Sequence, residues 1–205
     1  MIPVSIVTGF LGSGKTTLIG RLLRDPGFAD TAVIVNEWGE IGLDHHLIAS
    51  ADETLIALAG GCLCCRVRGD LITTLLDLER RRALGEIPRY ERVLIETSGL
   101  ADPGPILGAL MTDRDVTRTH AIGTVLTLVD ARHGAATLER HPEARRQVAL
   151  ADRLLLTKSD VAGRPDALLA RLAALNPNST LLSAVKGDIA PQALFTGSDP
   201  DARVP

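Results

Sequence analysis

Aromatic side chains are scarce in this sequence, so they cannot supply most of its interior. Trp, Tyr and Phe together make up 2% of the 205 residues, although 45% of the residues are hydrophobic. Leu, Ile, Val and Ala must therefore fill the core, which suits β-strands that alternate with helices. A chain of this length fits one domain with a sizeable core.

An excess of positive charge and long apolar runs are also lacking. The formal net charge is -3, and the basic residues are scattered among acids, so nothing marks a nucleic-acid binding face. No apolar run approaches the ~20 residues that a bilayer crossing needs. Met1–Val4 has no basic flank and is interpreted as the start of a buried strand, not as a signal peptide. We expect a cytoplasmic protein with no nucleic-acid or membrane partner.

Hydrophobic runs of strand length recur along the chain. They are Val4–Val7, Thr31–Val35, Thr54–Leu58, Arg92–Ile95, Ile122–Val129, Arg153–Leu156 and Thr180–Leu182. Segments with helical spacing separate several of them, such as the one that carries Leu18, Ile19, Leu22 and Leu23. The alternation predicts an α/β fold with a doubly wound, mostly parallel sheet flanked by helices. Ligands then bind beyond the carboxyl ends of the strands.

The segment Gly9–Thr17 has the pattern of a phosphate-binding loop, or P-loop, between a strand and a helix. Its glycines let backbone N–H groups turn toward phosphates, and the helix N-terminus adds its dipole. Lys15 would reach the β- and γ-phosphate oxygens, the Thr16 hydroxyl would ligate magnesium, and Thr17 would reach the α-phosphate. The alternative, a glycine-rich turn with a chance lysine, is disfavoured by the strand and helix on either side. The predicted nucleotide-binding residues here are Gly9, Gly12, Ser13, Gly14, Lys15, Thr16 and Thr17.

A carboxylate, Glu96, ends the run Arg92–Ile95 and precedes Thr97-Ser98-Gly99. In P-loop proteins an acid at such a strand end holds magnesium, usually through its water shell. We predict that Glu96 and Thr16 serve the magnesium ion and that the Gly99 backbone meets the γ-phosphate. The alternative for Glu96 is an ordinary exposed carboxylate at a strand end.

Three further acids, Glu37, Glu40 and Asp44, lie in a segment without clear periodicity after the second hydrophobic run. A connection of this length is more often functional than idle. These carboxylates could order an attacking water or ligate a metal, although each alone is explained as well by solvated surface. Glu37 is the candidate that joins Lys15 and Glu96 as a catalytic residue.

The tetrad Thr157-Lys158-Ser159-Asp160 follows the strand Arg153–Leu156. A buried carboxylate at Asp160 would accept the N1–H and N2 amino protons of guanine, a donor pair that adenine lacks. The Lys158 stem would cover the ring face, and Thr157 belongs to the same predicted site. Such a tetrad alone is weak and often only caps a helix, but a P-loop upstream favours nucleotide binding. The backbone of Ser183–Lys186 could complete the base pocket.

All three cysteines lie in Cys62-Leu63-Cys64-Cys65, directly after two glycines. An odd, clustered set is a poor disulfide framework and indicates a metal or redox site in a reducing compartment. Three sulfurs leave one tetrahedral position for water, a carboxylate such as Glu37, or a partner protein, which suits a site that gives its ion away. Zinc fits best, with cobalt or nickel as alternatives. Buried structural cysteines and a redox trio are the competing interpretations.

The loop that carries the cysteines must curl for all three thiols to converge. In an extended chain Cys62 and Cys64 would point to one face and Cys65 to the other. The neighbouring Arg66 and Arg68 would lower the thiol pKa values and favour thiolate ligands.

Together these motifs resemble the CobW-like branch of the P-loop GTPases, which are metallochaperones and metal-enzyme maturation factors. The resemblance implies slow GTP hydrolysis with Mg2+, and Zn2+ or Co2+ held at Cys62, Cys64 and Cys65. It also implies a client metalloprotein of unstated identity and, often, a nucleotide-dependent homodimer. The resemblance rests on Gly9–Thr17, Asn36–Glu40, Gly61–Cys65, Glu96–Gly99 and Thr157–Asp160.

Two departures from the family pattern stand out. Thr157 occupies a position where many GTPases carry Asn, so we expect a looser hold on the P-loop. Such proteins usually continue into a C-terminal domain, often with a His-rich stretch, and we expect neither within these 205 residues. We expect residues 1–196 to form a P-loop GTPase domain and residues 197–205 to be a flexible tail or truncated linker.

The working hypothesis is that the γ-phosphate and magnesium order the segments around Glu37–Asp44 and Glu96–Gly99. The cysteines lie between these segments in sequence, so their affinity for metal would differ between the GTP and GDP states. Two other functions compete with this hypothesis. One is a nucleotide-binding metal sensor or scaffold with negligible turnover. The other is an ATP-dependent kinase of a small metabolite, in which the cysteines are structural.

Overall fold

The structure is a computed structural model that describes residues 1–36, 55–57, 63–66, 71–162, 165–184 and 189–195. The strands are β1 (Ile2–Gly9), β2 (Thr31–Asn36), β3 (Leu55–Ala57), β4 (Leu63–Arg66), β5 (Arg92–Thr97), β6 (His120–Asp130), β7 (Arg153–Thr157) and β8 (Thr180–Ala184). The helices are α1 (Lys15–Leu22), α2 (Leu71–Ala83), α3 (Gly104–Thr112), α4 (Val116–Thr119), α5 (Gly134–Arg140), α6 (Pro142–Ala149), α7 (Ser159–Ala162), α8 (Asp166–Leu175) and α9 (Pro191–Phe195). A short 3-10 turn at Pro26–Phe28 follows α1.

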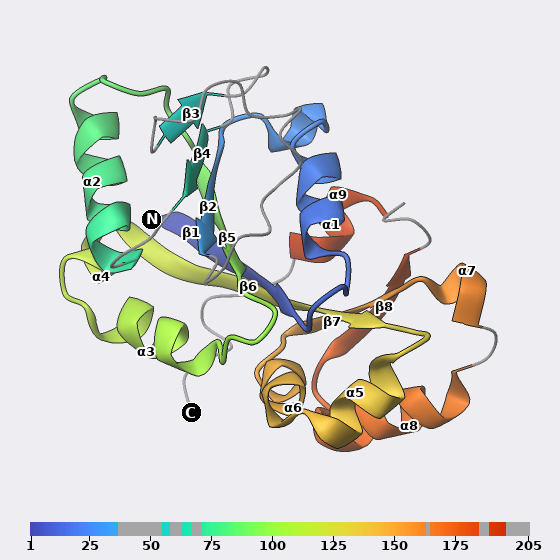
Figure 1. Cartoon of the computed structure of the whole chain (residues 1–205). Helices are drawn as coiled ribbons and strands as arrows, with labels where there is room; N and C mark the ends of the chain where they lie inside the picture. Colours follow the sequence, from blue (N-terminus) through green and yellow to red (C-terminus); the bar gives the residue numbers. More distant parts are fainter. Residues whose placement is uncertain (37–54, 58–62, 67–70, 163–164, 185–188, 196–205) are drawn as a thin grey trace.

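The described strands form one sheet with the order β3-β4-β2-β5-β1-β6-β7-β8. Neighbouring strands run parallel except at the β3 edge, where β3 is antiparallel to β4. Strand β1 lies at the centre between β5 and β6, and the chain moves outward from it in both directions (Figure 1). This order confirms the predicted doubly wound, mostly parallel α/β sheet.

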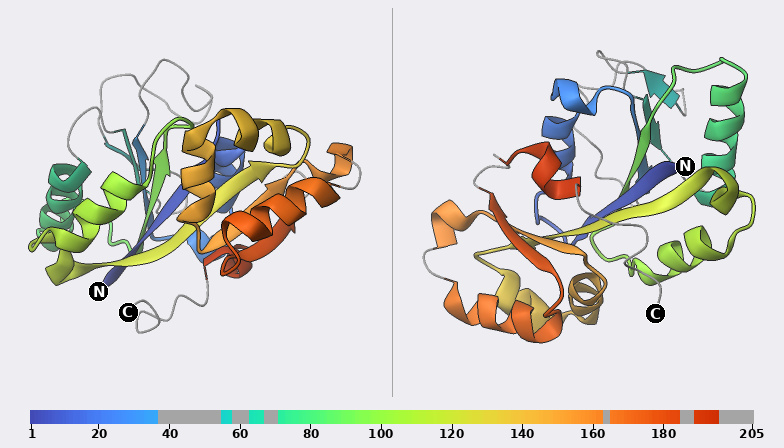
Figure 2. Two further views of the ribbon diagram at one scale, coloured as in Figure 1. Left: turned by 90° about the horizontal axis from the view of Figure 1, so that it is seen from below. Right: turned by 180° about the vertical axis from the view of Figure 1, so that it is seen from behind.

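Helices cover both faces of the sheet because successive strand residues point to opposite sides. On β5, Leu94 packs in a core with α1 and α9, whereas Val93 and Ile95 pack in a second core with α2, α3 and α4. A third core joins α5, α6 and α8 to the outer part of the sheet, where Leu154 and Leu156 of β7 are buried. The views from below and behind show the same layers (Figure 2). Aliphatic residues dominate all three cores, as the composition predicts.

Strand β4 differs from the sequence prediction, which placed Cys64 and Cys65 in a curled loop. The backbone there is extended and pairs on both sides, with β2 through Val33↔Cys64 and Ile34↔Cys65 and with β3 through Ile56↔Cys64. Leu-Cys-Cys-Arg has no β-branched residue that would signal a strand. Its partners in the sheet impose the extended form, and this information is not local.

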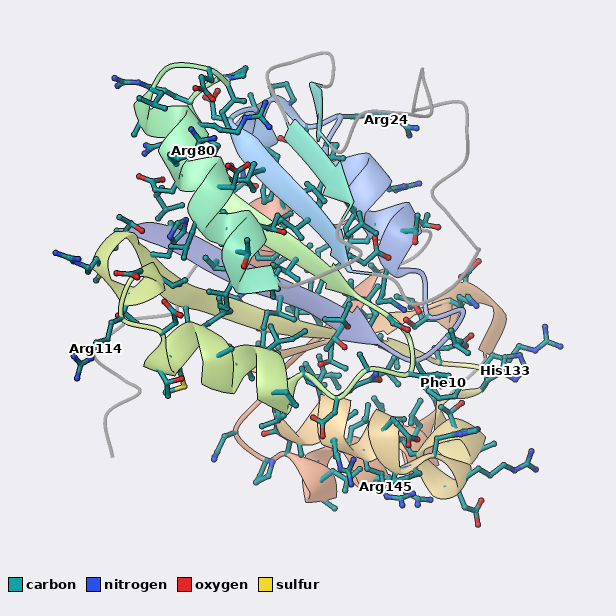
Figure 3. The ribbon with its side chains drawn as sticks, turned by 60° about the vertical axis from the view of Figure 1, so that its left-hand side comes forward. Phe10, Arg24, Arg80, Arg114, His133 and Arg145 are labelled. Atoms are coloured by element: carbon teal, nitrogen blue, oxygen red, sulfur yellow. The ribbon has the colours of Figure 1, made fainter. Side chains whose placement is uncertain are left out.

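The carboxyl ends of the central strands lie together at one end of the sheet, next to the P-loop segment and Glu96. Phe10 directly follows β1 and His133 follows β6, and both lie at this end of the molecule, whereas Arg114 lies at the opposite end (Figure 3). Within the described residues, no helix is both long and apolar enough to span a lipid bilayer.

Candidate nucleotide-binding site

The P-loop joins β1 directly to α1 and has a backbone that suits only glycine at several positions. Gly9, Gly12 and Gly14 have φ angles of 139°, 72° and 98°, in the region that side chains disfavour. Gly14 immediately precedes the first residue of α1, Lys15. The sequence therefore builds a left-handed turn that ends on a helix N-terminus, which is a natural anion-binding arrangement.

Lys15 lies over this loop and is 7% exposed. Its Nζ donates to the carbonyl of Gly9 at 2.9 Å and to that of Phe10 at 3.4 Å. An ammonium group has three N–H donors, and these contacts direct it toward the backbone of the loop. The charge is thus held at the P-loop, where the sequence predicted it.

Thr16 and Glu96 come together although they are 80 residues apart in sequence. The Thr16 hydroxyl donates to Glu96 Oε1 at 2.8 Å, and the Glu96 side chain is 1% exposed. The alternative of an ordinary exposed carboxylate at a strand end is therefore wrong. A hydroxyl and a carboxylate, both hard oxygen ligands, are the groups that Mg2+ prefers, so this pair fits the predicted magnesium site.

Gly99 packs directly against the P-loop. A Cβ atom built on it would lie 2.6 Å from Leu11 Cδ2 and 2.7 Å from the Leu11 backbone nitrogen, so the position accepts no side chain without movement. Next to Glu96, Thr97 Oγ1 donates to Thr8 Oγ1 at 2.8 Å and fastens β5 to β1. The segment after β5 therefore lies close to the loop that the sequence assigns to phosphate binding.

Thr157, at the end of β7, also binds the P-loop. Its hydroxyl is within hydrogen-bond distance of two carbonyl oxygens, that of Ser13 at 2.8 Å and that of Val129 at 3.3 Å. Because the residue is 8% exposed, these are buried bonds. The threonine hydroxyl thus makes a direct bond to the loop, and whether it holds the loop less firmly than an Asn would stays a prediction.

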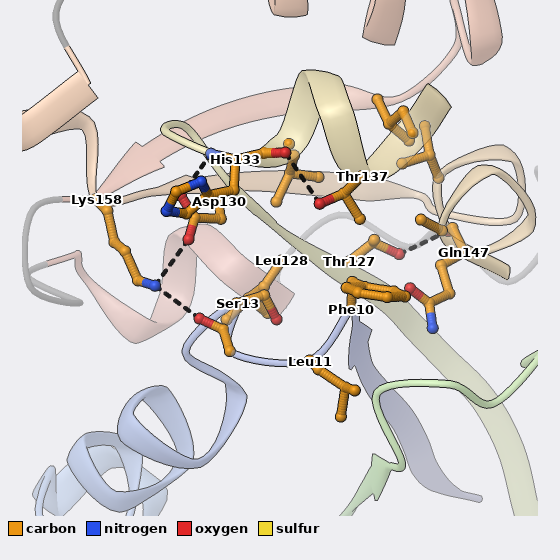
Figure 4. Close-up of a pocket in the computed structure, with 16 residues that line it drawn as sticks. Phe10, Leu11, Ser13, Thr127, Leu128, Asp130, His133, Thr137, Gln147 and Lys158 are labelled. Carbon is orange, nitrogen blue, oxygen red and sulfur yellow. Dashed lines mark hydrogen bonds and ion pairs between the residues drawn. The ribbon is translucent and has the colours of Figure 1, made fainter. Parts of the chain in front are cut away.

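Lys158, an exposed residue, links the P-loop to the end of β6. Its Nζ donates to the Gly12 carbonyl at 2.8 Å and forms a 2.7 Å ion pair with Asp130 Oδ2 (Figure 4). Partial burial opposes ionisation of Asp130, but the bonds from Lys158 and from the backbone N–H groups of Arg132 and His133 outweigh it, so the pKa of Asp130 is lowered. Asp130 was not predicted from the sequence, because one acid after a hydrophobic run carries no signal of its own.

Asp160 lies in the first turn of α7 and is exposed. The sequence led us to expect a buried carboxylate here, whereas the side chain is exposed in the structure; its pairing with guanine stays a prediction. Its neighbour Ser159 meets Ser183 of β8, whose hydroxyl donates to Ser159 Oγ at 3.2 Å. The end of β8 thus lies beside the Thr157–Asp160 tetrad, as a base pocket requires. Val185 and Lys186 lie outside the described residues.

A cavity of about 310 Å³ lies on the α5–α6 side of the P-loop (Figure 4). Phe10, Leu11, Gly12 and Ser13 form one wall, while β6, α5 and α6 form the others. The Phe10 ring also contacts the His141 ring, with the centroids 4.4 Å apart. Lys15 and Thr16 are not among the lining residues, so the cavity is distinct from the phosphate-facing side of the loop.

Several predicted residues cannot be placed. Glu37, Glu40, Asp44 and Cys62 lie outside the described residues, and only the backbone is described at Cys64 and Cys65. In the part of the chain that the structure describes, no group of three or more His, Cys, Asp or Glu side chains could hold a metal ion. The magnesium pair is smaller than such a group, and the thiolate site remains a prediction.

The parallel sheet, the P-loop and the acid at the end of the neighbouring strand define a P-loop nucleotide-binding protein. The chain belongs to the family described as CobW/HypB/UreG, nucleotide-binding domain, whose match covers residues 3–183.

Curated relatives include the "Zinc chaperone YjiA" of Escherichia coli (strain K12), which is 39% identical over 194 residues, 95% of this chain and 61% of that protein. The "Zinc-regulated GTPase metalloprotein activator 1" of Schizosaccharomyces pombe is 31% identical over 167 residues, 78% of this chain and 39% of that protein. The chain therefore spans less than two thirds of the length of each of these relatives.

Solved structures give the same picture. The crystal structure of the Zn(II)-bound YjiA GTPase from E. coli matches with a TM-score of 0.80 and 37% identity, and the match covers 95% of this chain and 61% of that one. HypB from Helicobacter pylori in complex with nickel matches with a TM-score of 0.58 and 16% identity over 91% of this chain and 80% of that one. The second likeness shows a shared fold only.

Proposed function

We propose that this chain binds GTP with Mg2+, hydrolyses it slowly, and couples the nucleotide state to zinc or cobalt binding at Cys62, Cys64 and Cys65. The observation that carries the nucleotide half is the 2.8 Å contact of Thr16 with the buried Glu96, beside the P-loop. Residues 1–196 would act as the nucleotide domain of a metallochaperone. The printed names of the relatives, which include zinc chaperones and a GTPase metalloprotein activator, support the metal half.

The phosphate site would be built from this chain's own groups. The glycines of the P-loop present backbone N–H groups, Lys15 neutralises the β- and γ-phosphate charge, and Thr17 meets the α-phosphate. Thr16 and Glu96 would hold Mg2+, which when bound offsets the charge that develops on the phosphate oxygens. Glu37 would orient the attacking water, and Gly99 would meet the γ-phosphate through its backbone.

Base selection is assigned to Asp160. Lys158 would cover one face of the guanine ring, and Thr157 would support the P-loop through its bond to the Ser13 carbonyl. Calorimetric titration should show GTP and GDP binding on the order of 100-fold more tightly than ATP, because a site built to pair with the guanine donors rejects adenine strongly. In Asp160→Asn the preference should shift toward a xanthine nucleotide, since the amide donates where the carboxylate accepted. Equal affinities of the wild type for GTP and ATP would favour the small-molecule kinase instead.

The proposed coupling of the nucleotide state to metal binding needs a separate experiment. Zinc titrations of the purified chain with GDP and with a non-hydrolysable GTP analogue should give different affinities, and Cys64→Ser should weaken both. Equal zinc affinities in the two nucleotide states would refute the coupling. Single-turnover hydrolysis with and without zinc separates a slow GTPase from a sensor or scaffold with negligible turnover. We also propose two partners that the family resemblance implies: a client metalloprotein and a second copy of this chain in a nucleotide-dependent homodimer.

A further inference from the structure

Gln147 of α6 is a buried polar residue whose amide is directed at the segment that follows Glu96. It is 1% exposed, and its Nε2 donates to the carbonyl of Gly99 at 3.1 Å and to that of Ala101 at 2.9 Å. A side-chain amide has two N–H donors, so both are used on one short stretch of backbone. Neither acceptor lies in the helix that carries Gln147.

The position of Gln147 is itself fixed from the sheet. Its backbone carbonyl accepts a 2.7 Å hydrogen bond from the hydroxyl of Thr127, a buried residue of β6. The Gly99–Ala101 segment has local turn bonds, such as that of the Ala101 N–H to the Ser98 carbonyl at 3.0 Å, but these do not anchor it to another element. The amide of Gln147 does, because it joins the segment to a helix that is fastened to β6.

Gly99 therefore lies between two fixed surfaces. Leu11 of the P-loop is on one side, so close that a Cβ atom would collide with it, and Gln147 holds the carbonyl on the other. Glycine has more backbone freedom than other residues, so contacts from neighbouring elements matter more for holding its backbone in one conformation. Gln147 also borders the 310 Å³ cavity, which leaves space into which its side chain can turn if the segment moves.

We propose that Gln147 is a positioning residue that holds the Gly99–Ala101 backbone at the place where it meets the terminal phosphate. The proposal rests on the proposed function, because it needs a triphosphate in the P-loop. Because Gln147 bonds this segment to α6, the position of helix α6 would depend on whether the γ-phosphate is present. The expected signature is a selective effect on the triphosphate state, since GDP has no group for this segment to meet.

Gln147→Met tests the proposal, because it keeps the length of the side chain and removes both donors. Affinity for a non-hydrolysable GTP analogue should fall on the order of tenfold, which corresponds to the loss of two ordinary hydrogen bonds. Affinity for GDP should stay within about twofold of the wild-type value. Arg146→Gln is the matched control, because the exposed Arg146 of the same helix forms a 3.5 Å ion pair with Asp102, the residue directly after the segment. It should leave both affinities nearly unchanged.

Gln147→Glu gives a second readout that a purely structural role would not produce. The ionised carboxylate would face two carbonyl oxygens and repel them, whereas the protonated acid regains one donor. Its affinity for the GTP analogue should therefore rise as the pH falls from 8 toward 5.5, relative to the wild type measured in parallel. This variant also keeps the test decisive if Gln147→Met does not fold.

The outcomes separate the two proposals. If the wild-type chain binds neither GDP nor the GTP analogue, the proposed function fails. If the wild type binds both but Gln147→Met weakens them equally, or Gln147→Glu shows no pH dependence beyond the wild type, the positioning role is overturned. A selective loss of the GTP analogue with recovery at low pH supports it.

Discussion

Replacing Thr157 by Val removes one hydroxyl group while keeping the shape of the side chain. The hydroxyl lies 2.8 Å from the Ser13 carbonyl and 3.3 Å from the Val129 carbonyl, and the residue is buried. Losing the stronger bond leaves a P-loop carbonyl without that donor, which costs about 1–2 kcal/mol. For a chain of this size, this corresponds to a fall in Tm of roughly 2–8 °C.

Urea unfolding without nucleotide is the assay, with Thr157→Ser and Thr137→Val as comparisons. Thr157→Ser keeps the hydroxyl and should retain most of the stability. Thr137→Val removes a hydroxyl that donates to the His133 carbonyl at 2.9 Å in an exposed position, where water replaces the bond, so it should be nearly neutral. If Thr157→Val and Thr137→Val have the same free energy of unfolding, the Thr157 hydroxyl does not anchor the P-loop.

Three further predictions concern the site and the opposite end of the sheet. Glu96→Gln should keep or raise the Tm, since it removes a buried charge, but should reduce the Mg2+-dependent gain in GTP-analogue affinity by about tenfold or more. Gly99→Ala should weaken the GTP analogue more than GDP because its Cβ meets Leu11, whereas Gly108→Ala, with nothing within 4 Å, should not. Burial lowers the pKa of His120, so the unfolded chain takes up a proton first below about pH 6.5, and stability present above that pH is lost as the pH falls. Urea unfolding of His120→Leu should show a smaller loss between pH 7.5 and 5.

The sequence predicted those parts of the molecule that local patterns encode. The hydrophobic runs located β1, β2, β3, β5, β6, β7 and β8, and the glycine spacing located the P-loop. The contact of Thr16 with Glu96 follows from two motifs at the carboxyl ends of neighbouring strands of one parallel sheet. Here periodicity and motif agreed with the tertiary structure, so the prediction and the fold coincide.

What the sequence could not supply depends on contacts between distant segments. Strand β4 has no strand-like composition and is extended because β2 and β3 pair with it. Gln147 looks like any polar residue on a surface helix, and only the fold shows that it is buried against the backbone after β5. The exposure of Asp160 also depends on how α7 sits at the end of β7. No periodicity or spacing carries this information.

The register of the sheet gives the cysteine-bearing strand a fixed distance from the acid of the nucleotide site. Ile34 pairs with Cys65 on one side and with Ile95, the residue before Glu96, on the other. Two strand spacings, on the order of 10 Å, therefore separate the backbone of Cys65 from that of Ile95. Any rearrangement at the carboxyl end of β5 must either carry β2 and β4 with it or break backbone bonds between them, so a stiff lateral connection already exists across these three strands.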